Sequence, residues 1–292
     1  AGTEPDAQAS MEKAPAPDAK VSAESAAIIN DLTEKGLLFS IATARTYATV
    51  IPLFKKVDLR VPLVLMNGVC IYDPTEKKTL SIHAIPPETG SEIDSLFSKF
   101  GKNPLLYFER DNRLTVKYKA LGNDNIRSYV TEREAFFNKT FEQVSAFDFF
   151  GSGNFVYVVT LDKKEALESL YSEMKKFKDI TCNFYGDNYT DSYFLEAMCA
   201  GVNKGCGAAE LKRMLGADKL IAFGDNINDI PLFEVADECY AVENACSELK
   251  RIATGIIGSN KDNSVAKVME KKFNEDRQVL ELGKLSNYYC KS

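Results

Sequence analysis

The stretch GDNIND, residues 224–229, gathers carboxylate and amide side chains in one short loop. It follows the apolar run KLIAF and precedes the helical pattern of IPLF, so Asp225 projects from the end of a predicted strand, after a glycine that permits a tight turn. Grouped oxygen ligands suit Mg²⁺, which takes one or two carboxylates, several waters and a substrate phosphate. The plainer interpretation is an Asn/Asp-rich turn that caps the next helix.

Two further polar residues stand at comparable positions. Thr43 directly follows the apolar run LLFSIA (37–42), and Lys204 opens a helical pattern that stops at Gly216. Polar residues at the carboxyl ends of parallel strands meet in one crevice, and helix N-termini and hydroxyl groups suit a phosphate. Taken singly, Thr43 would be an N-cap residue and Lys204 a solvated lysine. Their co-occurrence with the acidic loop favours a shared site.

The N-terminal flank alternates helix and strand. Ser22 caps a predicted helix that stops at Gly36, and the strand over 37–42 follows it. A helical pattern through Val50 leads to a second apolar strand over 62–68, which predicts a right-handed parallel crossover. Beyond it, residues 69–85 predict a hairpin that turns at Asp73-Pro74.

The C-terminal third repeats this alternation. The predicted elements are a helix over 204–215, a strand over 219–223, a helix over 231–236, a strand over 239–242, a helix over 247–253, a strand over 255–257 and a last helix through Val265 and Met269. Residues 21–83 and 191–273 together predict an α/β fold with a Rossmann-like, doubly wound parallel sheet as its core.

Residues 84–190 show a different pattern, which predicts an inserted α+β cap domain. A unit hinged over the strand ends closes an active site against water. Tyr107, Arg110, Tyr185 and Asp187 are candidates for substrate contacts from this cap, although packing or solvated surface is the favoured interpretation. The predicted helices cover 86–100, 132–137 and 163–177, and the predicted strands cover 105–109, 113–118, 154–161 and 180–185.

The composition excludes several classes of protein. The chain has 292 residues, is 45% apolar and carries a net charge of −6, which argues against a general nucleic-acid binder because phosphate-backbone affinity requires clustered Lys and Arg. No stretch approaches the roughly 20 apolar residues of a membrane span, and the start lacks a signal-peptide pattern. We therefore expect a soluble cytoplasmic protein that does not bind membranes. The oligomeric state is not readable.

Cysteine and histidine chemistry is also disfavoured. The seven cysteines form no CxxC pair and have no neighbouring histidine cluster, so they are interpreted as reduced structural thiols. The single histidine, His83, lies in or just after a predicted strand. A Ser-His-Asp mechanism would depend on it alone and has no supporting serine motif.

The order of these motifs resembles that of a known family. ATAR, a large insertion, VNKG, FGDNINDIPLF and then AVENACSELKRIAT is similar to the Cof-type subfamily of the haloacid dehalogenase superfamily, over about residues 20 to 273. Members are mostly Mg²⁺-dependent phosphatases of small phosphorylated metabolites. The resemblance is specific at three of the four superfamily motifs, which match at Thr43, at Lys204 and at the acidic loop.

The resemblance implies a role for each matched residue. Thr43, the backbone amide of Ala44 and Asn228 would hold the phosphoryl oxygens, and Lys204 would neutralise charge on the nucleophile and the phosphate. Asp225 would ligate Mg²⁺, with Asp229 supporting it from the same loop. These roles make chemical sense, because phosphoryl transfer depends mostly on charge neutralisation and positioning.

The family's first motif, D-x-D-G-T, is not recognisable. In the family its first aspartate attacks phosphorus to form an aspartyl-phosphate, and the second acts as general acid and base. The family's spacing from Thr43 places these positions near Ala9 and Met11, without an apolar strand before them, and the nearest acids, Asp6 and Asp18, lack the motif's context. No nucleophile is therefore assigned.

Residues 1–20 contain no Val, Ile, Leu or Phe, and their composition is typical of a flexible or altered segment. In the superfamily the first-motif strand lies between the strands that end at Thr43 and Asp225. Three explanations compete: a degenerate phosphatase that keeps only ligand binding, an altered or incomplete N-terminus, or a segment whose residues were never determined. A lineage that lost only catalysis would keep this strand for packing, so an incomplete or substituted N-terminus is favoured over an evolved pseudoenzyme. The C-terminal extension, 274–292, could extend a helix, pack on the core or remain loose.

Three functions remain open from the sequence. The leading hypothesis is a Mg²⁺-dependent phosphatase of a small phosphorylated metabolite such as a sugar phosphate or a nucleotide-like compound. The second is a non-catalytic protein that binds a phosphate ligand in the same pocket. The third is a phosphosugar mutase, because related caps occur in such enzymes.

Overall fold

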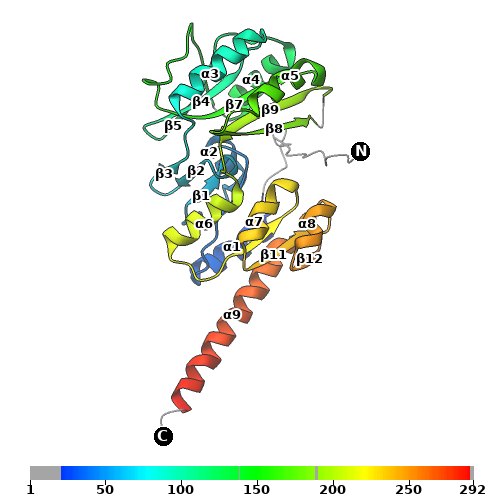
Figure 1. The fold of residues 1–292 in the computed structure, drawn as a ribbon. Coiled ribbons are helices and arrows are strands. Elements are labelled where there is room, and N and C mark those ends of the chain that lie inside the picture. The colour runs from blue at the N-terminus through cyan, green and yellow to red at the C-terminus, as the bar shows by residue number, and fades with distance from the viewer. Residues whose placement is uncertain (1–20, 138, 188–189, 290–292) are drawn as a thin grey trace.

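The computed structural model describes residues 21–137, 139–187 and 190–289 of the chain. A six-stranded sheet with its helices stacks on a second layer that holds two smaller sheets, and one long helix extends from the second layer (Figure 1). The described residues confirm the predicted α/β class. The expectations for residues 1–20 lie outside the described residues.

The first described elements form as local sequence signals predict. Helix α1 (Ala23–Glu34) begins where the hydroxyl of Ser22 accepts the backbone N–H of Ser25, and the chain leaves the helix through Gly36 in a left-handed conformation. Helix α2 (Tyr47–Val50) continues directly into the 3₁₀-helix η1 (Ile51–Phe54). These elements bracket the segment that contains Thr43.

The predicted strand over 37–42 does not form as a strand. Its only ladder contact among the described residues is a parallel bridge between Ala42 and Val64, flanked by hydrogen bonds from Val64 N–H to the Ile41 carbonyl and from Thr43 N–H to the Val64 carbonyl. A strand depends on partners as well as on its own apolar pattern. Here the described chain supplies a partner on one side only, and the other side borders a cavity.

The hairpin predicted after this segment is present. Strands β1 (Leu63–Leu65), β2 (Cys70–Asp73) and β3 (Lys78–Ile82) form an antiparallel sheet in that order. The carboxylate of Asp73 accepts the backbone N–H of Thr75 and closes the turn. A 3₁₀ turn, η2 (Met66–Gly68), joins β1 to β2, and its Asn67 has a left-handed φ of 56°.

The C-terminal third builds the second small sheet. Strands β10 (Ile221–Gly224), β11 (Glu238–Val242) and β12 (Gly255–Ile257) are parallel and lie in chain order, as the alternation predicts. The elements around them are helices α6 (Lys204–Leu215), α7 (Ile230–Val235) and α8 (Ser247–Ile252) and the 3₁₀ turns η3 (Ile227–Asp229) and η4 (Asn260–Asp262). Among the described residues, no strand joins this sheet to the β1–β3 sheet.

The six-stranded sheet has the order β6-β5-β4-β7-β9-β8. Successive residues of β4 enter different apolar clusters, because side chains alternate between the two faces of a sheet. Leu106 and Phe108 pack with the cluster of α3 and α5, whereas Tyr107 packs with the cluster of α4 and of β1 in the layer below. The elements are α3 (Pro87–Lys99), β4 (Leu105–Arg110), β5 (Arg113–Tyr118), α4 (Asp124–Phe137), β6 (Thr140–Gln143), β7 (Asn154–Asp162), α5 (Lys164–Met174), β8 (Ile180–Gly186) and β9 (Tyr193–Cys199).

Three features of this unit differ from the sequence analysis. Helix α4 begins eight residues before the predicted start at 132, and β6 was not expected. Strand β9 pairs with β7 and β8, so the six-stranded sheet continues past residue 190 to Cys199. Helix α4 starts earlier because Asn123 accepts the N–H of Ile126 and so caps its first turn. Strands β6 and β9 take their conformation from their neighbours in the sheet.

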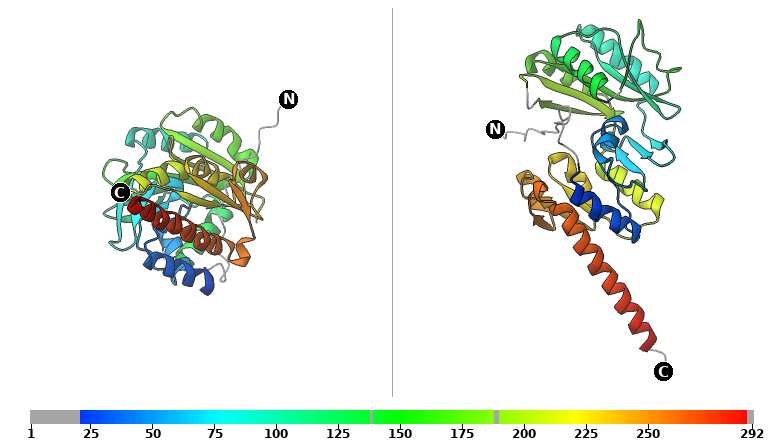
Figure 2. Two further views of the ribbon diagram at one scale, coloured as in Figure 1. Left: turned by 90° about the horizontal axis from the view of Figure 1, so that it is seen from below. Right: turned by 180° about the vertical axis from the view of Figure 1, so that it is seen from behind.

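Helix α9 (Ser264–Tyr289) contains residues 274–289 of the C-terminal extension. Its first turns pack on α1, where Met269 joins the cluster of Ala26, Ile29 and Leu32. The helix then continues through residue 289 and extends away from the rest of the chain (Figure 2). No helix of the described residues has both the length and the apolar character needed to cross a bilayer.

Candidate active site

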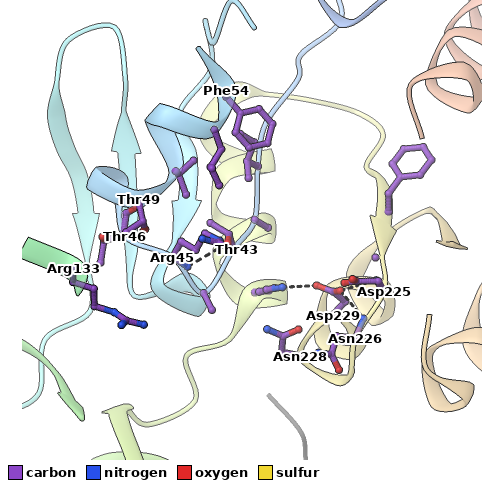
Figure 3. A pocket seen from close by; sticks show the side chains of 18 of the residues that line it. Thr43, Arg45, Thr46, Thr49, Phe54, Arg133, Asp225, Asn226, Asn228 and Asp229 are labelled. Carbon is purple, nitrogen blue, oxygen red and sulfur yellow. Dashed lines mark hydrogen bonds and ion pairs between the residues drawn. The ribbon is translucent and has the colours of Figure 1, made fainter. Parts of the chain in front are cut away.

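The predicted site residues border one cavity between the two layers and the two small sheets. Its volume is about 300 Å³, and Thr43, Ala44, Lys204, Asn228 and the Asp225/Asp229 pair all line it. Thr43 lies on one side of the cavity and the acidic loop on the other (Figure 3). Segments more than 150 residues apart in sequence therefore meet as the motifs predict, and the roles of the individual residues stay predictions.

The loop around Thr43 is fixed through its backbone. The Thr43 carbonyl accepts the N–H of Asn67, and the Arg45 carbonyl accepts the N–H of Met66. The Thr43 hydroxyl accepts the N–H of Arg45 at 3.2 Å, so the loop turns tightly around this side chain. No described group accepts the N–H of Ala44, which leaves this donor available at the cavity wall.

Lys204 reaches the cavity because α6 starts in close contact with α7. Asn203 caps the helix by accepting the N–H of Cys206. A Cβ on Gly205 would lie 2.1 Å from the carbonyl oxygen of Pro231, so only glycine permits this approach. The Nζ of Lys204 then lies 2.6 Å from Oδ1 of Asp229, and the two side chains are only 9% and 6% exposed. The solvated-lysine interpretation is therefore wrong.

The acidic loop is organised around Asp229. Its Oδ2 accepts the backbone N–H groups of Asp225 and Asn226 at 3.0 and 3.1 Å, while its Oδ1 accepts Lys204. Gly224 is required for steric reasons, because a Cβ there would lie 2.8 Å from the Asp229 side chain. Both oxygens of Asp229 thus serve the loop and the lysine, and the Asp225 carboxylate remains for the cavity.

The electrostatic environment of Asp225 is that of a partly buried acid next to a second acid. Burial raises its pKa, the negative charge of Asp229 raises it further, and Lys204 opposes both effects. A cation bound at this carboxylate would relieve the same unfavourable charge. Asp225 and Asp229 are the two carboxylates that line the cavity in the described part of the chain.

The donor set is compatible with Mg²⁺ in a limited way. Within residues 21–289, apart from the undescribed positions, no group of three or more His, Cys, Asp or Glu side chains could hold a metal ion. Magnesium usually binds through one or two carboxylates and keeps several waters, so a single available carboxylate at Asp225 fits this ion better than it would fit zinc or calcium. Asp229 would support the site indirectly, because its Oδ2 holds the backbone of the loop that carries Asp225.

Asn67 is a site residue that the sequence analysis missed. Its side chain is buried, and its Oδ1 lies 3.4 Å from Nδ2 of Asn228, so it orients the amide that lines the cavity. Its backbone N–H also holds the Thr43 carbonyl. The signal was present as Asn-Gly after an apolar strand, a pair typical of left-handed turns.

The six-stranded unit contributes Arg133 and Lys139 to the cavity wall, and neither was predicted. Of the predicted contacts, Tyr107 and Tyr185 are buried in the apolar cluster, as the packing interpretation favours. Arg110 and Asp187 do not line the cavity either. His83 also lies elsewhere, with its Nε2 3.0 Å from Glu210 Oε2, and the six cysteines in the described residues are free thiols.

Comparison with known proteins agrees with this architecture. A 5-amino-6-(5-phospho-D-ribitylamino)uracil phosphatase of Bacillus subtilis (strain 168) is 27% identical to the chain over 266 residues, which cover 84% of this chain and 90% of the relative. An HMP-PP phosphatase of Serratia proteamaculans (strain 568) is 22% identical over 258 residues, which cover 87% and 89% of the two chains.

Solved structures share the fold. A crystal structure of a Thermotoga maritima protein superposes with a TM-score of 0.71 at 24% identity and covers 86% of this chain and 91% of its own. A haloacid dehalogenase-like hydrolase from Bacteroides thetaiotaomicron gives 0.69 at 19% identity, with coverage of 86% and 92%. The family model described as haloacid dehalogenase-like hydrolase matches residues 16–269. The chain therefore belongs to the haloacid dehalogenase-like hydrolase family.

Proposed function

We propose that the chain hydrolyses the phosphomonoester of a small phosphorylated metabolite. The observation that carries this proposal is the meeting of Thr43, Lys204 and Asp225 at one cavity of about 300 Å³. This volume is at the lower end of the range for small-molecule sites. A hydroxyl, an ammonium and a carboxylate in one enclosed site are the groups needed to hold a dianion together with a cation.

Each group has a position suited to one part of the phosphoryl group. The Thr43 hydroxyl, the Ala44 N–H and the Asn228 amide would donate hydrogen bonds to its oxygens, and Asn67 orients that amide. Lys204 would neutralise negative charge next to them while Asp229 holds its Nζ in place. Charge-assisted bonds of this kind are the stronger class of hydrogen bond. Preorganised groups that meet developing charge are a large part of catalysis by such sites.

Magnesium is the proposed cofactor. Bound at Asp225, it would neutralise charge on the phosphoryl oxygens. Asp229 fixes the loop that presents Asp225, because its Oδ2 accepts the two N–H groups at the start of that loop. The resemblance implies hydrolysis through an aspartyl-phosphate. No described residue is assigned as that nucleophile, since both cavity carboxylates already have other roles.

The six-stranded unit is proposed to act as the cap that selects the metabolite. It supplies Arg133 and Lys139 to the same cavity and shares an apolar cluster with the layer below. Closing such a unit over the strand ends would exclude water from the phosphoryl group.

A second candidate function is phosphate-ligand binding without turnover. It is favoured by one observation, namely that Asp225 and Asp229 are the only carboxylates at the cavity among the described residues. Hydrolysis of p-nitrophenyl phosphate with Mg²⁺ separates the two candidates. Turnover that disappears in Asp225→Ala supports the phosphatase, whereas saturable binding of inorganic phosphate with no turnover supports the binder and contradicts the phosphatase.

A further inference from the structure

Two cations from the six-stranded unit line the cavity opposite the proposed magnesium site. Arg133 lies on α4 and is 7% exposed, and Lys139 lies immediately before β6 and is partly buried. Figure 3 shows the guanidinium of Arg133 extending from its helix into the space that Thr43 and the acidic loop also border. Neither cation belongs to the motifs that the proposed hydrolysis uses.

The described groups that contact these two cations orient them but carry no negative charge. The guanidinium carbon of Arg133 lies 3.4 Å from the ring centroid of Tyr129, and one of its N–H groups donates to the Tyr129 carbonyl at 3.3 Å. An arginine has five N–H donors, so this bond uses one of them. The Nζ of Lys139 lies 5.0 Å from the ring centroid of Tyr107. Aromatic rings and a carbonyl orient a cation but carry no compensating charge.

Among the described residues, no ion pair compensates the charge of these cations: the pairs found there include neither Arg133 nor Lys139. Glu196 is an acid that interacts electrostatically with Arg133, and its Oε2 already accepts the hydroxyl of Tyr157 at 2.9 Å. This carboxyl is buried, and burial raises its pKa to about 7.

The cations also repel one another. Burial and the charge of Arg133 lower the pKa of Lys139 to about 7. An arrangement that gathers like charges in a partly dry cavity is unfavourable on its own. An anion bound between them would remove that penalty.

We propose that Arg133 and Lys139 form a second anion subsite, so that the metabolite carries a carboxylate or a second phosphate in addition to the phosphoryl group that is hydrolysed. This inference rests on the proposed function for the position of the first phosphoryl group. Arg133 would bind the second anionic group through two N–H donors, the geometry that a planar guanidinium offers to carboxylates and phosphates. Lys139 would add one positive charge beside the same anionic group.

Matched ligand pairs test the subsite by equilibrium binding, without turnover. The members with the phosphate as their one anionic group are sorbitol 6-phosphate and glycerol 3-phosphate, and their partners with an added carboxylate are 6-phosphogluconate and 3-phosphoglycerate. Fructose 1,6-bisphosphate against fructose 6-phosphate provides the pair for a second phosphate. Dissociation constants are measured by calorimetry without added Mg²⁺, conditions in which the proposed hydrolysis does not consume the ligand.

The wild-type chain is expected to bind the doubly anionic member of at least one pair about tenfold or more tightly than its partner, the range of one charge-assisted bond. Arg133→Gln and Lys139→Gln should each reduce this preference and leave the dissociation constants of the members with one anionic group unchanged. Arg127→Gln, on the exposed face of the same helix, is the matched control and should keep the preference.

Three results would overturn the subsite. They are no preference in the wild type, a preference that survives in both variants, or an equal loss of affinity for the members with one anionic group, which would place the cations on the first phosphoryl group. Lys139→Gln decides the matter if Arg133→Gln does not fold, because Lys139 is less buried. Turnover of p-nitrophenyl phosphate without a preference would remove the subsite alone. A preference without turnover would remove the proposed hydrolysis and keep the subsite.

Discussion

The buried pair of Lys204 and Asp229 allows the geometry of the site to be tested through stability. Their charged atoms are 2.6 Å apart, and both side chains are less than a tenth exposed. Removing one partner of such a pair costs about 3–5 kcal/mol, because it leaves an uncompensated buried charge. Lys204→Met and Asp229→Asn should therefore each lower the free energy of unfolding by about that amount.

The double variant distinguishes an ion pair from two independent packing effects. If the effects were additive, Lys204→Met with Asp229→Asn would cost about 6–10 kcal/mol, the sum of the two single values. Because the second substitution removes the charge that the first leaves unpaired, the double variant should instead cost about as much as one single variant. The expected coupling energy is about 3 kcal/mol, near the upper end of measured couplings.

Urea unfolding followed by circular dichroism measures all four proteins. The matched control is the exposed pair Asp31 and Lys35 at the C-terminal end of α1, four residues apart. Its coupling should be about 0.3–0.5 kcal/mol and should fall in high salt. Coupling at Lys204 and Asp229 should persist in high salt. Additive single effects, with a coupling below about 0.5 kcal/mol, would refute the buried ion pair and with it the fixed position of Lys204.

Three further substitutions have defined expectations. Burial raises the pKa of Glu196 to about 7, so the folded chain binds more protons than the unfolded chain between about pH 4.5 and 7, and stability from this group falls as pH rises through that window. Near pH 4.5, Glu196→Gln should have the wild-type melting temperature. At pH 8 its melting temperature should be higher, which corresponds to a gain on the order of 3 kcal/mol in the free energy of unfolding. Equal dependence of the melting temperature on pH in the two proteins would contradict this. Gly205→Ala should destabilise the chain by about 1–3 kcal/mol in chemical unfolding, because its Cβ meets the Pro231 carbonyl, whereas Gly122→Ala, with its nearest contact at 3.5 Å, should be nearly neutral. Thr43→Val should raise the KM for p-nitrophenyl phosphate about tenfold or more and Thr43→Ser should restore it, and an unchanged KM in Thr43→Val would exclude the hydroxyl from the site.

Local signals in the sequence predicted the elements that depend on their own residues. Ser22 and Gly36 mark the ends of α1, and Asp73 closes its turn, because caps and turns are made within a few residues. The meeting of Thr43 with the acidic loop was also predictable, since strand ends on one edge of a parallel arrangement lie close together.

Features that depend on distant partners were not predictable. The segment over 37–42 has the apolar pattern of a strand, yet its described backbone pairing is confined to the side of Val64. Arg133 and Lys139 have no motif of their own and reach the cavity only because α4 packs on the lower face of the six-stranded sheet. Asp229 was expected to support a metal, and its engagement with Lys204 and two backbone N–H groups emerged only from the folded loop.

Diffraction from crystals grown with Mg²⁺ and inorganic phosphate would locate both ligands in the cavity. We expect a phosphate within about 3 Å of the Thr43 hydroxyl, the Asn228 amide and the Lys204 ammonium, with the cation on the Asp225 carboxylate. A phosphate bound away from Thr43 and Lys204, or a cation that does not contact Asp225, would contradict it.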